Sequence, residues 1–289
     1  MKISNEDFTI ETTKVDNDKN ICLLGDLHIR PNTSYRFLNM ILEKINSDSY
    51  DFIVFDGDFV YSPDDFSDPK CNAKIKDLLR ELSFISPVFI VPGNHDIKNE
   101  KEGTDYLKSL ESISNVKLLL NEQLTYNGIN ITGFNPSIKV YYYKYKDNWF
   151  IYYVNDFVNC LFNFYKESYN VFITHSPQIV GEDLIVNYLS KWYENIDLIL
   201  CAHMHDGFIP KPLQSKIIGS KGLEFSDSDS ILESRIGINS NCRGMHSIEN
   251  AKIIITRGLR KYVLRSRIFD IVDDEVSHDI TSIKLTRKL

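Results

Sequence analysis

The sequence predicts an α/β fold built around a mostly parallel β-sheet. Short apolar runs typical of buried strands alternate with segments of helical periodicity over most of the chain up to residue 205. Such an alternation favours right-handed β-α-β crossovers and parallel strands. Of the 289 residues, 43% are hydrophobic, which is enough for a sizeable core, and 25% are charged, which is ordinary for a globular protein.

The first part of the chain gives the clearest strand and helix signals. Turn and cap residues at Pro31–Ser34 precede a helix that reaches about Asn46, with apolar residues on one face. The expected strands are 20–26, 51–55 and 88–91, and a polar stretch at 63–69 precedes a helix at about 73–83.

The middle of the chain contains a hairpin and an aromatic segment. Asn127-Gly128 is a strong turn signal between two short strands. Residues 136–169 are rich in Tyr, Phe and Trp, and a helix is expected from Trp149 onward. That helix either packs on the core or forms a lid or platform over the site for a ring or acyl chain. The other expected elements are a helix at 104–111, strands at 116–120, 123–126, 129–133, 171–174 and 197–201, and a helix at 183–193.

The tail beyond residue 205 changes to short β-like runs. We expect it to form a second sheet packed on the first, within one β-rich part at about 211–289. Its predicted strands are 216–219, 252–256, 262–264 and 280–285.

Charge and cysteine content limit the classes of protein. The net charge of −7 gives no basic footprint for non-specific DNA binding. The five cysteines are dispersed and form no CxxC pair, so we expect reduced thiols, with Cys22 and Cys201 buried in strands. With no signal peptide and no long apolar run, the expectation is a soluble cytoplasmic protein without a transmembrane segment.

Five predicted strand ends finish in residues that can hold metal ions. Ligands collect outside the carboxyl ends of strands in layered α/β folds, so these residues are expected to converge. Five of the seven histidines fall in these motifs, and no thiolate does, which suits Mn, Fe, Zn or Co. The motifs are Gly25-Asp26-Leu27-His28, Gly57-Asp58, Gly93-Asn94-His95-Asp96, His175 and Ala202-His203-Met204-His205.

These motifs resemble those of the calcineurin-like metallophosphoesterase superfamily, in the same order, over about residues 20 to 210. The resemblance implies a four-layer αββα sandwich of two mixed β-sheets flanked by helices, formed by residues 1–289 as a single domain. It also implies two divalent metal ions, Mn²⁺ favoured over Fe or Zn. One ion would be held by Asp26, His28, Asp58 and His205, and the other by Asp58, Asn94, His175 and His203.

The resemblance also assigns catalytic roles. A hydroxide that bridges the two ions would attack phosphorus, and Asp58 would offer one carboxylate oxygen to each ion. His95 would stabilise the transition state or protonate the leaving oxygen. Asp96 would either orient His95 or cap a local turn. Asp56, two residues before Asp58, is the less favoured ligand because it lacks the Gly-Asp match.

Departures from the family pattern bear on which class of phosphoesterase the protein belongs to. Tyr61 stands where protein Ser/Thr phosphatases carry an aspartate followed by arginine, and Val91-Pro92 lacks an arginine too. Both differences oppose a protein phosphatase. Ala202 replaces the glycine of GHxH, at little cost if its φ is not positive.

Other candidate residues lie outside the five motifs. The segment around Arg257-Gly258-Leu259 resembles the closing strands of a bacterial phosphohydrolase subgroup. Its basic residues, Arg257 among them, form either a solvated edge or a contact to substrate phosphate. His246 and His278 are expected on the solvated surface.

The sequence therefore predicts a metal-dependent phosphoesterase, a phosphodiesterase or pyrophosphohydrolase before a monoesterase. Its substrate would be a small-molecule, lipid or nucleotide phosphoester. The alternatives are a DNA-repair nuclease of the same superfamily, which would share the core ligands, or a catalytically inactive scaffold of the same fold. Because all ligand positions and His95 are present, the scaffold is disfavoured.

Overall fold

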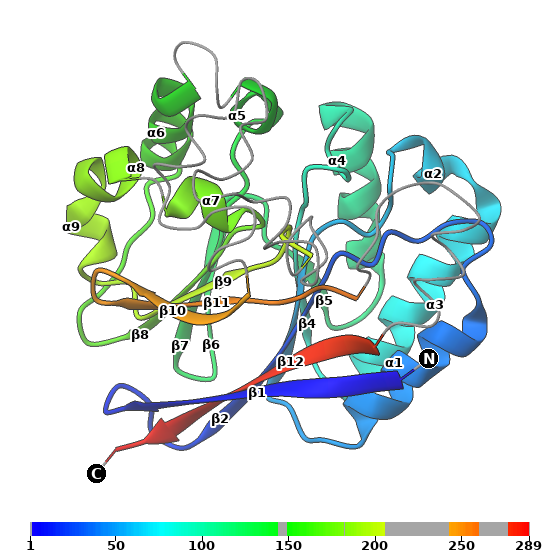
Figure 1. Ribbon diagram of the computed structural model, residues 1–289, viewed down its shortest axis with the longest axis horizontal. Helices are drawn as coiled ribbons and strands as arrows, with labels where there is room; N and C mark the ends of the chain where they lie inside the picture. The colour runs from blue at the N-terminus through cyan, green and yellow to red at the C-terminus, as the bar shows by residue number, and fades with distance from the viewer. Residues whose placement is uncertain (1, 144–148, 182, 206–242, 260–276, 289) are drawn as a thin grey trace, which may run out of the picture.

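The computed structural model describes residues 2–143, 149–181, 183–205, 243–259 and 277–288. Over these residues two mixed six-stranded sheets pack against each other, and helices cover their outer faces (Figure 1). The predicted four-layer αββα sandwich is confirmed.

The first sheet has the strand order β1-β12-β2-β3-β4-β5. Strands β2 to β5 run parallel to one another, whereas β12 is antiparallel to β2 and parallel to β1. The strands are β1 (Lys2–Thr12), β2 (Lys19–Gly25), β3 (Phe52–Asp56), β4 (Val88–Val91), β5 (Val116–Leu118) and β12 (Ser277–Arg287).

Local signals explain where the helices beside this sheet begin. The Ser34 side chain accepts a hydrogen bond from the Phe37 N–H and caps the first helix, as predicted. The third helix begins earlier than predicted because Asp68 caps its first turn and Pro69 fits the first helical position. The elements are α1 (Tyr35–Asn46), α2 (Asp64–Ser67), α3 (Pro69–Ile85), α4 (Glu100–Ser109) and the short 3₁₀ helix η1 (Leu110–Ser112).

The second sheet has the order β10-β11-β9-β8-β7-β6, with a parallel centre and antiparallel edges. Asn127 and Gly128 have φ angles of 49° and 80°, as the predicted tight hairpin turn requires. The strands are β6 (Glu122–Tyr126), β7 (Ile129–Gly133), β8 (Tyr169–Ile173), β9 (Leu198–Cys201), β10 (Gly244–Ile248) and β11 (Ala251–Ile255).

Helices cover the outer face of this sheet in a separate group (Figure 1). The single helix predicted at 183–193 is divided at Leu189 into two short helices. The elements are α5 (Ile138–Tyr143), α6 (Trp149–Asn159), α7 (Pro177–Val180), α8 (Asp183–Tyr188) and α9 (Ser190–Tyr193).

The prediction that the tail builds the second sheet is wrong. Of the tail strands that the structure describes, β12 returns to the first sheet between β1 and β2, whereas β10 and β11 join the second. The second sheet is instead built mainly by β6 to β9. The strands predicted at 216–219 and 262–264 lie outside the described residues.

Three groups of buried apolar side chains separate the four layers. One lies between the first sheet and its helices, one between the second sheet and its helices, and one between the sheets. Cys22 and Cys201 are buried and free, as predicted. In the described parts of the chain, no helix has the length and apolar character needed to cross a bilayer.

Candidate metal centre

Parallel strands from both sheets deliver the predicted residues to one place. In the first sheet β2 ends just before Asp26, β3 just before Asp58 and β4 shortly before Asn94. In the second sheet β8 leads to His175 and β9 to His203. Because the carboxyl ends of parallel strands share one edge of a sheet, residues far apart in sequence become neighbours.

Several residues of this centre have a backbone conformation that is rare for side-chain-bearing residues. Such left-handed conformations cost about 1–3 kcal/mol each and persist where the surroundings hold them. Hydrogen bonds between neighbouring loops do so here: the Asp26 N–H donates to Gly57 O at 3.0 Å and the His28 N–H to Asp58 O at 2.9 Å. The residues and their φ angles are Asp26 (52°), His28 (42°), Asp58 (55°), His203 (71°) and His205 (49°).

Asp26, His28 and His205 form the first of two groups with metal-ligand spacing. One donor atom of each lies within 4.8 Å of the others, and all three residues are buried. The Nε2 atoms of His28 and His205 are 3.4 Å apart, and His205 Nε2 is 3.6 Å from Asp26 Oδ1. His28 Nδ1 donates to the carbonyl of Val60 at 3.2 Å, which leaves Nε2 free to bind a metal.

Asp58, His175 and His203 form the second group. His175 Nε2 lies 3.3 Å from Asp58 Oδ2, and His175 Nδ1 donates to the Asp56 carbonyl at 2.9 Å. That bond again leaves the Nε2 lone pair for a metal. Asn94 offers a buried side-chain oxygen without a hydrogen-bond partner among the described residues.

Asp58 joins the two groups. Its Oδ2 atom is 3.6 Å from His28 Nε2 and 3.3 Å from His175 Nε2, so one oxygen faces both groups. Its Oδ1 atom accepts a hydrogen bond from the His95 N–H at 2.9 Å. The expectation of one oxygen for each ion stays a prediction, because an ionised carboxylate oxygen that accepts one N–H keeps a second lone pair for a metal ion.

Burial and mutual charge set the protonation of this centre. Burial alone would lower the pKa of His175, but the charge of Asp58 outweighs it and raises that pKa to about 10. Burial also opposes ionisation of Asp58, yet His175, His95 and His28 hold its pKa well below the ordinary value. Burial lowers the pKa of His28, which keeps its imidazole neutral.

His95 lies beside the first group. Its ring is 5.1 Å from that of His28, edge to face, and its Nδ1 donates to the Tyr61 carbonyl at 2.7 Å. Because Nδ1 is engaged in this way, Nε2 is the ring nitrogen left for substrate. The ring of Tyr61 lies 5.1 Å from that of His95. Sequence reasoning noted Tyr61 only as a departure from the family pattern.

Asp96 contacts backbone rather than the His95 ring. Its carboxylate accepts hydrogen bonds from the N–H groups of Asp58 at 2.7 Å and Gly93 at 3.0 Å. Of its two expected roles, this geometry fits the capping of local loops. Burial, followed by the charge of Asp58, raises the pKa of Asp96 to about 7.

Three other residues considered in the sequence analysis lie outside the two donor groups. Asp56 is buried, but neither metal-ligand group contains it. His246 is half-buried, and its Nε2 bonds to the Arg243 carbonyl. The prediction of a solvated His278 is wrong: it is 3% exposed and packs on Phe37.

Arg257 does not lie at the solvated edge considered for it. It is 8% exposed and donates to Asp279 Oδ2 at 3.0 Å, so the solvated edge is wrong, and the contact with a substrate phosphate stays a prediction. The next residue, Gly258, lies directly against the Asp26 carboxylate. The remaining basic residues of that segment, from Arg260 to Arg267, lie outside the described residues.

The residues present fit a dinuclear divalent-metal site. Among the described residues, Asp26 Oδ1, Asp58 Oδ2, Asn94 Oδ1 and His175 Nε2 are buried without a hydrogen-bond partner. Burying such ligand atoms without a partner costs free energy unless they bind a cation. Carboxylate, amide and imidazole donors without thiolate suit divalent transition metals.

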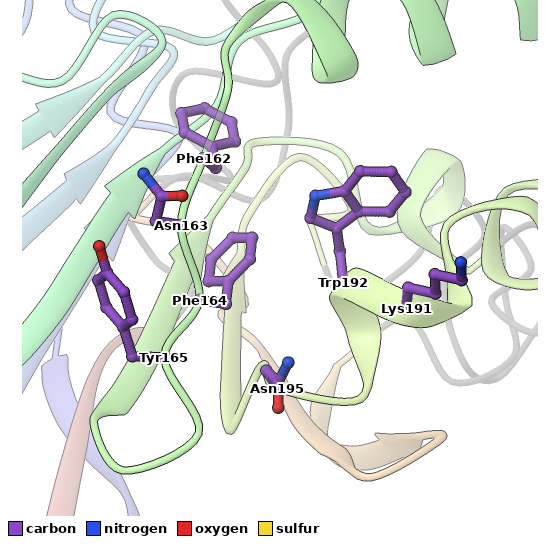
Figure 2. Close-up of a pocket in the computed structure, with 7 residues that line it drawn as sticks. All are labelled: Phe162, Asn163, Phe164, Tyr165, Lys191, Trp192 and Asn195. Carbon is purple, nitrogen blue, oxygen red and sulfur yellow. The ribbon is translucent and has the colours of Figure 1, made fainter.

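A separate pocket of about 350 Å³ lies away from this centre. Figure 2 shows Phe164 and Trp192 on two sides of it, with Asn195 below. Its residues precede β8 and β9, at the strand ends opposite to those that carry the donors. The lining is Phe162, Asn163, Phe164, Tyr165, Lys191, Trp192 and Asn195.

Comparison with known proteins places this centre in a family. The family model for calcineurin-like phosphoesterases matches residues 19–207, which include every predicted metal ligand. The chain belongs to the calcineurin-like phosphoesterase family.

Similar curated proteins are uncharacterized metallophosphoesterases. One from Helicobacter pylori strain 26695 is 25% identical over 199 residues, covering 68% of this chain and 47% of the relative. One from Campylobacter jejuni is 24% identical over 200 residues, covering 69% and 47%. The chain thus matches about half the length of these relatives.

Solved structures with a similar fold have low sequence identity. A dimetal phosphatase from Danio rerio has a TM-score of 0.45 and 11% identity, covering 84% of this chain and 88% of that one. The protein TT1561 of Thermus thermophilus has a TM-score of 0.46 and 10% identity, covering 83% and 89%.

Proposed function

We propose that this protein is a two-metal hydrolase of phosphodiesters or diphosphates. The observation that carries the proposal is the pair of donor groups that meet at Asp58 Oδ2, with His95 beside them. When bound, two divalent ions would supply Lewis acidity towards the phosphoryl group and lower the pKa of bound water. We favour Mn²⁺ at both positions, ahead of Fe and Zn.

Each side chain has a distinct task in this proposal. Asp26, His28 and His205 would hold one ion, Asn94, His175 and His203 would hold the other, and Asp58 would serve both. His95 directs Nε2 at the substrate, because Nδ1 is held by a carbonyl. There it stabilises the developing charge or gives a proton to the leaving oxygen.

In the same proposal, Asp96 holds the loops of the site in position. Its carboxylate accepts hydrogen bonds from the N–H groups of Asp58 and Gly93, and these bonds fix the loops that carry Asp58 and His95. It is therefore a positioning residue rather than a group that contacts substrate.

The surroundings of two residues, Arg257 and Tyr61, support diesters over monoesters. A monoester phosphate carries about one more negative charge than a diester at neutral pH, and arginines commonly offset it. Arg257 is ion-paired with Asp279, and tyrosine replaces the motif aspartate that precedes arginine in protein phosphatases. A substrate with a singly charged phosphoryl group fits these surroundings better.

The experiment compares hydrolysis of bis-p-nitrophenyl phosphate and p-nitrophenyl phosphate by the Mn²⁺-loaded protein and by His95→Asn. We expect the diester to be preferred, and the variant to lose about 100-fold or more in kcat with its metal content unchanged. A folded, metal-loaded wild-type protein no more active than His95→Asn with any divalent metal would refute the proposal.

A further inference from the structure

The aromatic segment at 136–169 contributes to the metal centre through one residue. Helix α6 follows the first of its two predicted roles, since Tyr153 and Phe157 are buried in the core beneath it. Helix α5, which the sequence did not predict, carries Tyr141. The ring of Tyr141 lies 6.1 Å from that of His203, at an interplanar angle of 58°.

The Tyr141 hydroxyl is buried and has no hydrogen-bond partner among the described residues. Burial, followed by the charges of Asp56 and Asp58, raises the pKa of this hydroxyl. The contact of its ring with His203 places Tyr141 beside the second donor group. A phenol hydroxyl is ordinarily protonated at neutral pH, so this group can donate a hydrogen bond.

A buried phenol normally finds a hydrogen-bond partner. The unpartnered buried atoms of the metal centre, Asp58 Oδ2 and Asn94 Oδ1 among them, are acceptors that divalent ions would satisfy. A protonated phenol complements the opposite kind of group, an anionic oxygen. A phosphoryl group bound at the two ions presents such oxygens.

We propose that Tyr141 is a specificity-determining residue whose hydroxyl donates a hydrogen bond to a non-bridging oxygen of the bound phosphoryl group, on the side of His203. The inference rests on the proposed function and deepens it. Tyr141 and His95 would then contact the substrate from opposite groups of donors, since His95 lies beside His28 and Tyr141 beside His203.

The test uses Tyr141→Phe, which removes the hydroxyl and keeps the ring against His203. Tyr169→Phe is the matched control, because Tyr169 is also buried with an unpartnered hydroxyl but lies at the start of β8, at the opposite strand end. Both variants and the wild type are loaded with Mn²⁺, and their metal content and thermal unfolding are compared. Inorganic phosphate is then titrated by calorimetry, and kcat/KM is measured on bis-p-nitrophenyl phosphate.

We expect phosphate to bind Tyr141→Phe about 10-fold or more weakly, as for the loss of one hydrogen bond to a charged group. The variant's kcat/KM should fall by a similar factor, with unchanged metal content, while Tyr169→Phe matches the wild type. Equal phosphate affinity in all three proteins would overturn the inference and leave hydrolysis standing. So would a loss in Tyr141→Phe that follows reduced metal content alone, since the hydroxyl would then support the ligands. A wild type that binds phosphate through Tyr141 but hydrolyses nothing would instead refute the proposed function and keep this inference.

Discussion

Gly258 offers a sharp test of how the C-terminal part of the chain supports the metal centre. Its φ is +81°, and a Cβ added there would lie 2.7 Å from both the Cβ and the Oδ2 of Asp26. The next N–H, that of Leu259, donates to the Gly25 carbonyl at 2.9 Å, so the backbone cannot easily retreat. Gly258→Ala must therefore displace Asp26 or strain the loop.

The expected cost has two parts. A left-handed backbone costs an L-residue about 1–2 kcal/mol. Overpacking against Asp26 adds about 1–3 kcal/mol. If Asp26 moves instead, the second part is observed as a metal affinity lower by about 10- to 100-fold, as for other disturbed supports of metal ligands.

Gly128→Ala is the matched control, because its φ is +80° and nothing lies within 4 Å of the added Cβ. In urea unfolding of the metal-free protein, the left-handed backbone should lower the free energy of unfolding of both variants. Only Gly258→Ala should also lose stability from the clash or lose Mn²⁺ affinity in a calorimetric titration. If the two variants behave alike in both measurements, the reasoning is wrong.

Three further predictions concern the supports of the centre and its ions. Asp96→Asn should lower the free energy of unfolding by about 1–3 kcal/mol in urea titrations, because the Val60 N–H, which donates to Asp96 Oδ1 at 3.4 Å, loses its acceptor when an NH₂ group takes that place; unchanged stability would contradict this. Burial alone would raise the pKa of Asp279, but hydrogen bonds from Ser4 and Arg257 outweigh burial and lower that pKa. The ion pair therefore stabilises the folded protein above about pH 4, and this contribution is lost as the pH falls further. Asp279→Asn should therefore cost about 3 kcal/mol at pH 7 and clearly less at pH 3, and an equal loss at both values would refute the assignment. Chelation should lower the thermal unfolding midpoint, because ions that bind only the folded state stabilise it by about 2.7 kcal/mol at a concentration 100 times Kd; a midpoint that chelators do not move would argue against structural coupling of the ions.

The strand ends were predictable because chemistry and periodicity coincide there. Apolar runs such as Ile53–Phe55 indicate buried strands, and the Asp or His that follows has no reason to be there except function. The parallel topology then brings them together. What the motifs do not encode is loop geometry, so the hydrogen bond from the His95 N–H to Asp58 Oδ1 was not foreseen.

The errors occurred where neighbours from distant parts of the chain decide the outcome. Strand β1 was missed because Lys2–Thr12 alternates polar and apolar residues weakly, and it forms by pairing with β12 from the other end of the chain. His278 is buried because β12 crosses beside Phe37 of α1. Arg257 was read from local charge, whereas its partner Asp279 lies on β12. Local sequence carries no signal for these contacts.

The central claim is that two donor groups sharing Asp58 hold two ions. The most direct measurement is the metal content of the Mn²⁺-reconstituted protein and of Asp58→Asn, determined by mass spectrometry after removal of free metal. The structure predicts two ions per chain in the wild type and a loss at both sites in the variant, because Asp58 Oδ2 faces both groups. One ion per chain in the wild type, or two retained in Asp58→Asn, would contradict it.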